Sequence, residues 1–173
     1  QLNALTAFQV KALSTAAIVA MTTAQIAAME TADVAAMGTT QVAALTTSQV
    51  KSMTTAQVAG LGTTQVSNLT TTQLVALSTT QIAAIETSDL AAITTPQLVS
   101  VTTSQIAALT TTQVVGLGST QVSVLTTKQL AAMTTTQIAS METADLAAIT
   151  TANITGLTTA QVAGMGTTQV SSL

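Results

Sequence analysis

The chain has 173 residues, of which 47% are hydrophobic, 5% are charged and 1% are aromatic, and its formal net charge is −3. The absence of histidine and cysteine excludes disulfide bonds, thiolate metal sites and histidine-based catalysis. The chain has three basic residues in all, which are too few for a nucleic-acid-binding surface. Threonine and glutamine recur too often to leave the roughly 18 consecutive apolar residues of a membrane span.

An eight-residue repeat runs through the whole chain. A Leu, Met, Ile or Val recurs at residue 5 and at every eighth residue through Leu173, and we number this residue position one. Written from it, the unit reads Leu-Thr-Thr-x-Gln-Val-x-small, as at 45–52. Residues 1–4 already fit positions five to eight, and Leu173 opens a further unit. We therefore expect one continuous array over 1–173, without separate domains.

Each unit is predicted to form one short helix. Along a continuous helix, eight residues leave a side chain about 80° from where the unit began, so no apolar stripe would form. A strand fails too, because positions one and six would face opposite sides. Threonine at position three is expected as the N-cap, since Pro96 follows Thr95 and proline suits the first helical position. The expected helices cover 8–13, 16–21 and every corresponding stretch through 168–173, from position four to the next position one.

Helix ends and faces follow from the same spacing. Positions six and one lie three residues apart and share a face, so these two and the small residue at position eight are expected to point inward, while positions four and seven point outward. Position two is glycine in four units, where we expect the helix to end in a left-handed residue: Gly38, Gly62, Gly118 and Gly166. The lysines occupy only the outward positions four and seven: Lys11, Lys51 and Lys128.

The predicted fold is an all-α solenoid of very short helices, one per octad. A helix of about six residues is not stable alone, so each unit must stack on its neighbours. The glutamines at position five would bond to neighbouring backbone or to each other. A β-solenoid with threonine ladders is the alternative fold.

Three acidic units are the candidate metal site. Glu-Thr-x-Asp replaces Thr-Thr-x-Gln three times at steps of 56 residues, which also indicates a superrepeat of about seven octads. Two carboxylates three residues apart near a helix start would hold Ca²⁺ together with backbone oxygens and water. The alternative is that the acids stabilise the helix start and keep the rod soluble. The candidate calcium ligands are Glu30, Asp33, Glu86, Asp89, Glu142 and Asp145.

The consensus Leu-Thr-Thr-x-Gln-Val/Ile-Ala-Ala covers the entire chain. It resembles the threonine-rich octapeptide arrays of giant secreted and surface proteins of Proteobacteria, often labelled adhesins or haem-utilisation/adhesion proteins. The resemblance implies an extracellular or cell-surface stalk, fibre or sheath. It transfers no binding residue and no cofactor to this chain.

The function expected from the sequence is that of a structural rod or fibre segment of an extracellular filament or cell-surface adhesin. We expect it not to be an enzyme, because its hydroxyls have no base to activate them. Since both chain ends keep the apolar repeat pattern, the expected partner is another copy stacked end to end, or the rest of a longer array, rather than nucleic acid or a membrane. The alternative is a threonine surface that binds ice or a polysaccharide.

Overall fold

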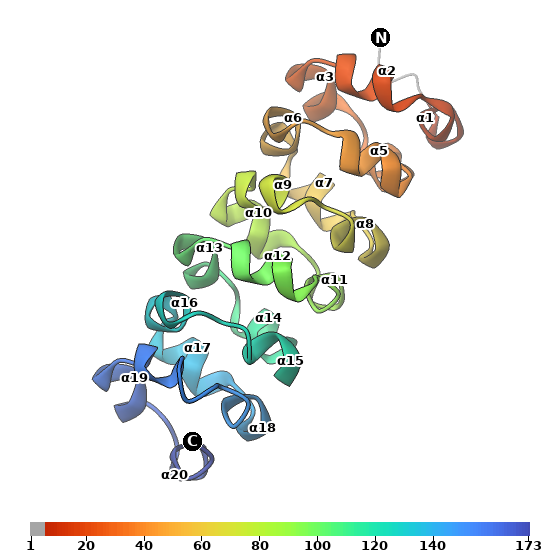
Figure 1. The fold of residues 1–173 in the computed structure, drawn as a ribbon. Helices are drawn as coiled ribbons and strands as arrows, with labels where there is room; N and C mark the ends of the chain where they lie inside the picture. Colours follow the sequence, from red (N-terminus) through yellow and green to blue (C-terminus); the bar gives the residue numbers. More distant parts are fainter. Residues whose placement is uncertain (1–5) are drawn as a thin grey trace.

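The computed structural model describes residues 6–173, which form a rod of short helices stacked one coil upon the next (Figure 1). No strand occurs among these residues, so the all-α solenoid is confirmed and the β-solenoid is wrong. The helices are α1 Ala7–Ala12, α2 Thr15–Ala20, α3 Thr23–Ala28, α4 Thr31–Ala35, α5 Thr39–Ala44, α6 Thr47–Ser52, α7 Thr55–Ala59, α8 Thr63–Ser67, α9 Thr71–Ala76, α10 Thr79–Ala84, α11 Thr87–Leu90, α12 Thr95–Ser100, α13 Thr103–Ala107, α14 Thr111–Val115, α15 Ser119–Val122, α16 Thr127–Ala132, α17 Thr135–Ser140, α18 Thr143–Leu146, the 3₁₀ helix η2 Ile154–Gly156, α19 Thr159–Ala163 and α20 Thr167–Val170.

Each α-helix begins one residue earlier than the sequence predicted, whereas the 3₁₀ helix η2 begins two residues later. The N-cap of the α-helices is position two, as at Thr102, whose side-chain oxygen accepts the N–H of Gln105 at 3.2 Å while the Gln105 Oε1 accepts the Thr102 N–H at 3.0 Å. This reciprocal pair is a capping box, which needs its two members three residues apart. Position three is therefore the first helical residue, and Pro96 lies second in α12, behind the N-cap Thr94.

Each helix ends without a left-handed residue. The backbone is extended at position one, as at Leu77 with φ −62° and ψ 140°, and it stays extended at the position-two N-cap that follows. No described residue has a positive φ, so the expectation of left-handed glycines is wrong. Gly62 has φ −90° and ψ 169° and is the N-cap of α8. Positions one and two thus form an extended corner between consecutive helices.

Three helices make one coil of the rod. Each helix packs against the third helix before it and the third after it, as α7 does against α4 and α10. The rod therefore has three sides of stacked helices. The first side contains α1, α4, α7, α10, α13, α16 and η2, the second contains α2, α5, α8, α11, α14, α17 and α19, and the third contains α3, α6, α9, α12, α15, α18 and α20.

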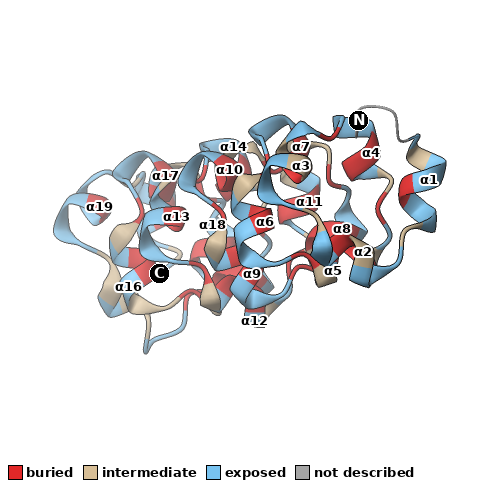
Figure 2. Cartoon of the chain, turned by 90° about the horizontal axis from the view of Figure 1, so that it is seen from above, coloured by how far each residue is buried: buried red, intermediate tan, exposed pale blue. Residues whose placement is uncertain are grey.

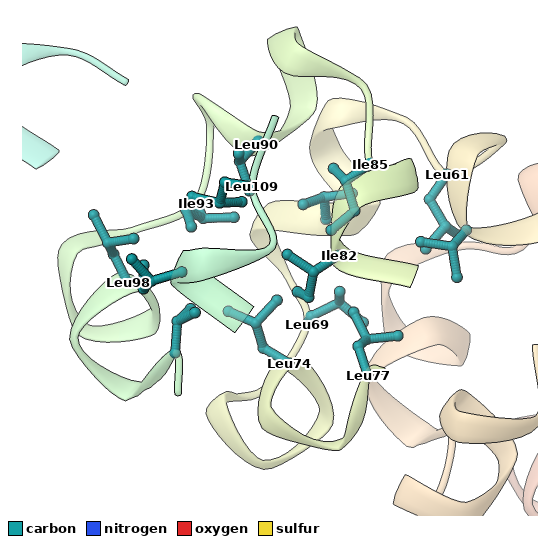
Figure 3. Close-up of a cluster of buried hydrophobic side chains, with 14 of the residues drawn as sticks. Leu61, Leu69, Leu74, Leu77, Ile82, Ile85, Leu90, Ile93, Leu98 and Leu109 are labelled. Atoms are coloured by element: carbon teal, nitrogen blue, oxygen red, sulfur yellow. The ribbon is translucent and has the colours of Figure 1, made fainter. Parts of the chain in front are cut away.

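The core is a narrow column of apolar side chains along the rod. Figure 2 shows that the buried stretches face the inside of the coils while the exposed stretches lie outside. Positions six and one supply it, as Figure 3 shows for Leu74 in α9, Ile82 in α10 and Leu77 at the corner between them, whose side chains lie close together. Position four is exposed throughout, which confirms that it faces outward. Position eight is mostly half-buried, so its expected place in the core is wrong. Position five takes that place, because its glutamines are buried from Gln41 onward.

Position eight is small because consecutive coils approach closely there. A Cβ added to Gly156 would collide with the backbone of Thr127 in the preceding coil, and backbone cannot turn aside as a side chain can. A Cβ on Gly38 would meet nothing closer than the Gln41 Oε1 at 3.7 Å. Glycine is therefore required by packing at Gly156 but not at Gly38.

We expect Gly156→Ala to lower the free energy of unfolding by about 1–3 kcal/mol, since overpacking forces the backbone apart. Gly38→Thr is the control, because threonine is the usual N-cap of this array and fits the space. It should change stability by only a few tenths of a kcal/mol, in the stabilising direction. Urea unfolding followed by circular dichroism measures both. Equal effects of the two substitutions would contradict the close approach at Gly156.

Candidate functional site

The most regular polar structure in the rod is a ladder of position-five glutamines that joins consecutive coils. The Gln105 Oε1 is held by its own helix start, while the Nε2 reaches back to the preceding coil and donates to the carbonyl oxygens of Leu74 at 2.9 Å and Leu77 at 2.8 Å. Those acceptors lie 31 and 28 residues earlier. The glutamines that donate to a carbonyl 28 residues earlier are Gln41, Gln49, Gln57, Gln65, Gln73, Gln81, Gln97, Gln105, Gln113, Gln121, Gln129, Gln137, Gln161 and Gln169.

Each rung of this ladder fixes a corner of the coil below. Leu74 lies in α9 and Leu77 forms the corner between α9 and α10, so Gln105 in α13 bonds to the turn that links two other helices. The Leu74 carbonyl also accepts the Leu77 N–H at 3.3 Å, whereas no backbone N–H among the described residues donates to the Leu77 carbonyl, so the amide supplies the donor that the corner carbonyl lacks. No fully enclosed side-chain nitrogen or oxygen among the described residues is left without a partner.

The predicted calcium ligands fall into two different environments. The aspartates Asp33, Asp89 and Asp145 are 4%, 6% and 6% exposed. Glu30, Glu86 and Glu142 are exposed N-caps whose side chains make no capping hydrogen bond.

Two of the buried aspartates accept a hydroxyl hydrogen bond from the preceding coil. The Asp89 Oδ1 accepts from the Thr63 Oγ1 at 2.5 Å, and the Asp145 Oδ1 accepts from the Ser119 Oγ at 2.6 Å. Asp33 stands 26 residues after Ala7, which has no hydroxyl to offer.

The three acidic units do not lie near one another. They belong to α4, α11 and α18, which are on the first, second and third sides of the rod. The superrepeat of seven octads is not a multiple of the three octads in a coil, so each acidic unit is turned by one side from the last. Among residues 6–173, no group of three or more acidic, histidine or cysteine side chains is close enough to hold a metal ion together.

The outer surface carries hydroxyls and few charges. All three lysines are exposed, as expected for positions four and seven. A groove of about 780 Å³ follows the corner between the first and second sides, across three coils. It opens where glycine replaces the N-cap threonine, and its lining includes Lys11, Ser14, Gly38, Thr40, Gly62 and Thr64.

Among residues 6–173, every helix falls short of the length and hydropathy of a membrane span.

Comparison with known protein families gives one match. A family profile described as the ALTTAQ repeat matches residues 1–30, 26–63, 82–119, 106–135 and 138–173. Searches among curated proteins and among solved structures each returned no match. The matched segments together cover most of the chain and most of the octads that build the glutamine ladder.

Proposed function

The chain belongs to the ALTTAQ repeat family, and we propose that it is a structural rod segment of an extracellular filament or cell-surface adhesin. The observation that carries this proposal is the glutamine ladder, which repeats with the apolar core from coil to coil. Nearly every unit contributes a glutamine that holds consecutive coils together, and an elongated structure of this kind is suited to a stalk or fibre. The proposed location outside the cell rests on the resemblance to surface and secreted arrays.

Each coil has two chemically different faces, which supports head-to-tail assembly. Toward the preceding coil it presents glutamine amides, and toward the following coil it presents corner carbonyls and position-six side chains. Val10 and Ile18 in the first coil are buried, whereas Val162, Val170 and Leu173 in the last coil are exposed. The glutamine face of a second copy of the chain, or of the next coil of a longer array, can cover that surface. Such a contact does not close on itself, so it grows a filament.

The assembly is tested by sedimentation velocity over a range of chain concentrations, with electron microscopy of the same samples. We expect filaments one rod wide whose length grows with concentration. Val162→Lys with Val170→Lys should prevent growth, because charges would replace exposed apolar contacts between copies. Val75→Lys is the matched control, since Val75 is an exposed valine on a side of the rod. A chain that stays monomeric at high concentration contradicts end-to-end growth.

The alternative function is a hydroxyl surface that binds ice or a polysaccharide. The groove beside Gly38 and Gly62 favours it, because its hydroxyls lie around exposed backbone. Inhibition of ice recrystallisation, or binding to immobilised polysaccharides that Gly38→Thr and Gly62→Thr abolish, would support it. Filament growth without either activity would favour the structural role.

A further inference from the structure

The glutamine ladder is interrupted at two of the acidic units. Asp89 and Asp145 occupy position five, where a carboxylate replaces the amide and has no N–H to donate. By the ladder spacing, the corner carbonyls that they should serve belong to Val58 and Leu61 for Asp89, and to Val114 and Leu117 for Asp145. Among residues 6–173, no side chain donates a hydrogen bond to any of these four oxygens, and the Val58 and Val114 oxygens accept the backbone N–H groups of Leu61 and Leu117. The equivalent Leu74 oxygen accepts two hydrogen bonds, one from the Leu77 N–H and one from the Gln105 Nε2.

The shorter aspartate side chain would leave a space in front of the corner carbonyl oxygens. In intact rungs, the Gln81 Nε2 lies 2.7 Å from the Met53 carbonyl oxygen, and the Gln105 Nε2 lies 2.8 Å from that of Leu77. An aspartate ends one C–C bond, about 1.5 Å, earlier, so its oxygens stop short of the corner. If the aspartate side chain follows the same course as the glutamines, the position of the absent amide nitrogen lies between the carboxylate and the two carbonyl oxygens. Carboxylate and carbonyl oxygens are the ligands that Ca²⁺ takes, at 2.3–2.6 Å.

The buried carboxylates also lack an opposite charge. The helices stacked on α11 are α8 and α14, and neither contains a lysine. The Asp89 Oδ1 has the Thr63 hydroxyl as its donor, and no hydrogen bond among the described residues ends on Oδ2. The Asp89 residue is 94% buried, and its one hydrogen-bond donor among the described residues is the neutral Thr63 hydroxyl, so a bound cation would supply the positive charge that the neighbouring helices do not.

The two corners opposite Asp89 and Asp145 share a second feature that is independent of the acids. Leu61 lies between Gly60 and Gly62, and Leu117 lies between Gly116 and Gly118. A Cβ on Gly62 or Gly118 would meet nothing within 4 Å, so the space above each corner is open. The fold does not require glycine there, and threonine would cap the helix better. Open space beside the two carbonyls gives an ion its entry path and room for its remaining water ligands.

We propose that Asp89 and Asp145 each bind one Ca²⁺ ion between coils. The ligands are the aspartate carboxylate, the two corner carbonyls, the neighbouring hydroxyl oxygen of Thr63 or Ser119, and water. The ion takes over the role of the absent amide and joins the coils on either side. Of the six acidic residues that the sequence marks, the exposed glutamates are not ligands. The corner equivalent for Asp33 lies outside the described residues. This proposal does not depend on the proposed assembly.

The test uses the full chain freed of metal with a chelator. Isothermal titration with CaCl₂ should show binding with Kd between about 0.1 and 1 mM, the range of sites with few charged ligands. The melting temperature should rise by about 2–4 °C at saturating Ca²⁺, and much less with MgCl₂ or NaCl at equal ionic strength.

Three variants separate ion binding from packing. Asp89→Gln should lose one Ca²⁺ per chain and melt higher than the wild type in chelator, because it restores the ladder. Asp89→Asn should lose the same ion without that gain, since its amide is too short. Glu86→Gln, the matched control, should keep the full stoichiometry. The proposal is overturned if the wild type binds no Ca²⁺ in titration, or if Asp89→Gln binds as much as the wild type.

Discussion

Val50→Asp is expected to unfold the coils around α6, whereas Lys51→Glu beside it leaves the rod intact. Val50 is 1% exposed and lies between the stacked helices α3 and α9, so its replacement buries a charge with no partner. We expect a loss of about 4 kcal/mol or more in the free energy of unfolding. Lys51 is exposed, and reversing its charge should change stability by less than about 0.5 kcal/mol.

The measurement for Val50→Asp must be local, because long repeat arrays do not unfold as a single unit. Hydrogen exchange followed by mass spectrometry should show lost protection from α3 to α9 and retained protection near α17. Leu109→Asp, at a buried position one, should produce the same loss near α13. If Val50→Asp and Lys51→Glu proved equally harmless, the inward direction of position six would be wrong.

The sequence predicted the fold class because every octad carries the same local signals. The spacing of positions six and one gave the buried face, and the lysines at positions four and seven marked the outer face. The predicted helix start is one residue later than the observed one, because the prediction places Pro96 at the first helical position whereas α12 begins at Thr95. The better signal was Thr-x-x-Gln, which places threonine at position two and glutamine three residues later, as a capping box requires.

The number of helices per coil could not be predicted, because the units are nearly identical. No substitution marks every third octad and so reveals the length of a coil, and the superrepeat of seven octads is not a multiple of three. The coil is set instead by the extended backbone at the corners, such as Leu77 and Ser78. The sequence predicts that the glutamines bond to neighbouring backbone. It does not predict that the acceptors lie 28 and 31 residues earlier, because that spacing depends on the number of helices per coil.

The acidic units illustrate the same limit. Sequence reasoning paired Glu86 with Asp89, because the two are three residues apart on one helix start. The fold places them in different surroundings, since Glu86 is the exposed N-cap while Asp89 is buried and accepts a hydrogen bond from Thr63 of the preceding coil. The oxygens that complete the proposed site come from a corner 28 residues earlier, which only the stacking of coils brings near.

Gln105→Glu is expected to break the ladder at one rung while preserving shape. Gln105 is 2% exposed, and its Nε2 donates to Leu74 and Leu77. Glutamate keeps the oxygen that accepts the Thr102 N–H, but it points a second, negatively charged oxygen at two carbonyl oxygens. Leaving such a charge buried and unpaired should cost about 3–5 kcal/mol at pH 7.

The loss in Gln105→Glu should depend on pH in a known direction. Burial beside carbonyl oxygens raises the pKa of the introduced carboxyl in the folded rod above its value in the unfolded chain. The deficit is therefore complete above the folded pKa, shrinks as pH falls through it, and is smallest below the unfolded value of about 4.3. Ser104→Glu is the control, because it adds the same charge at an exposed position of α13. The natural carboxylates contribute equally to both variants, so the difference in unfolding free energy between the variants reports the buried carboxyl alone. Urea unfolding of both variants at pH 7 and pH 4 measures the difference. If Gln105→Glu were no less stable than Ser104→Glu at pH 7, the amide would not be what holds one coil to the next.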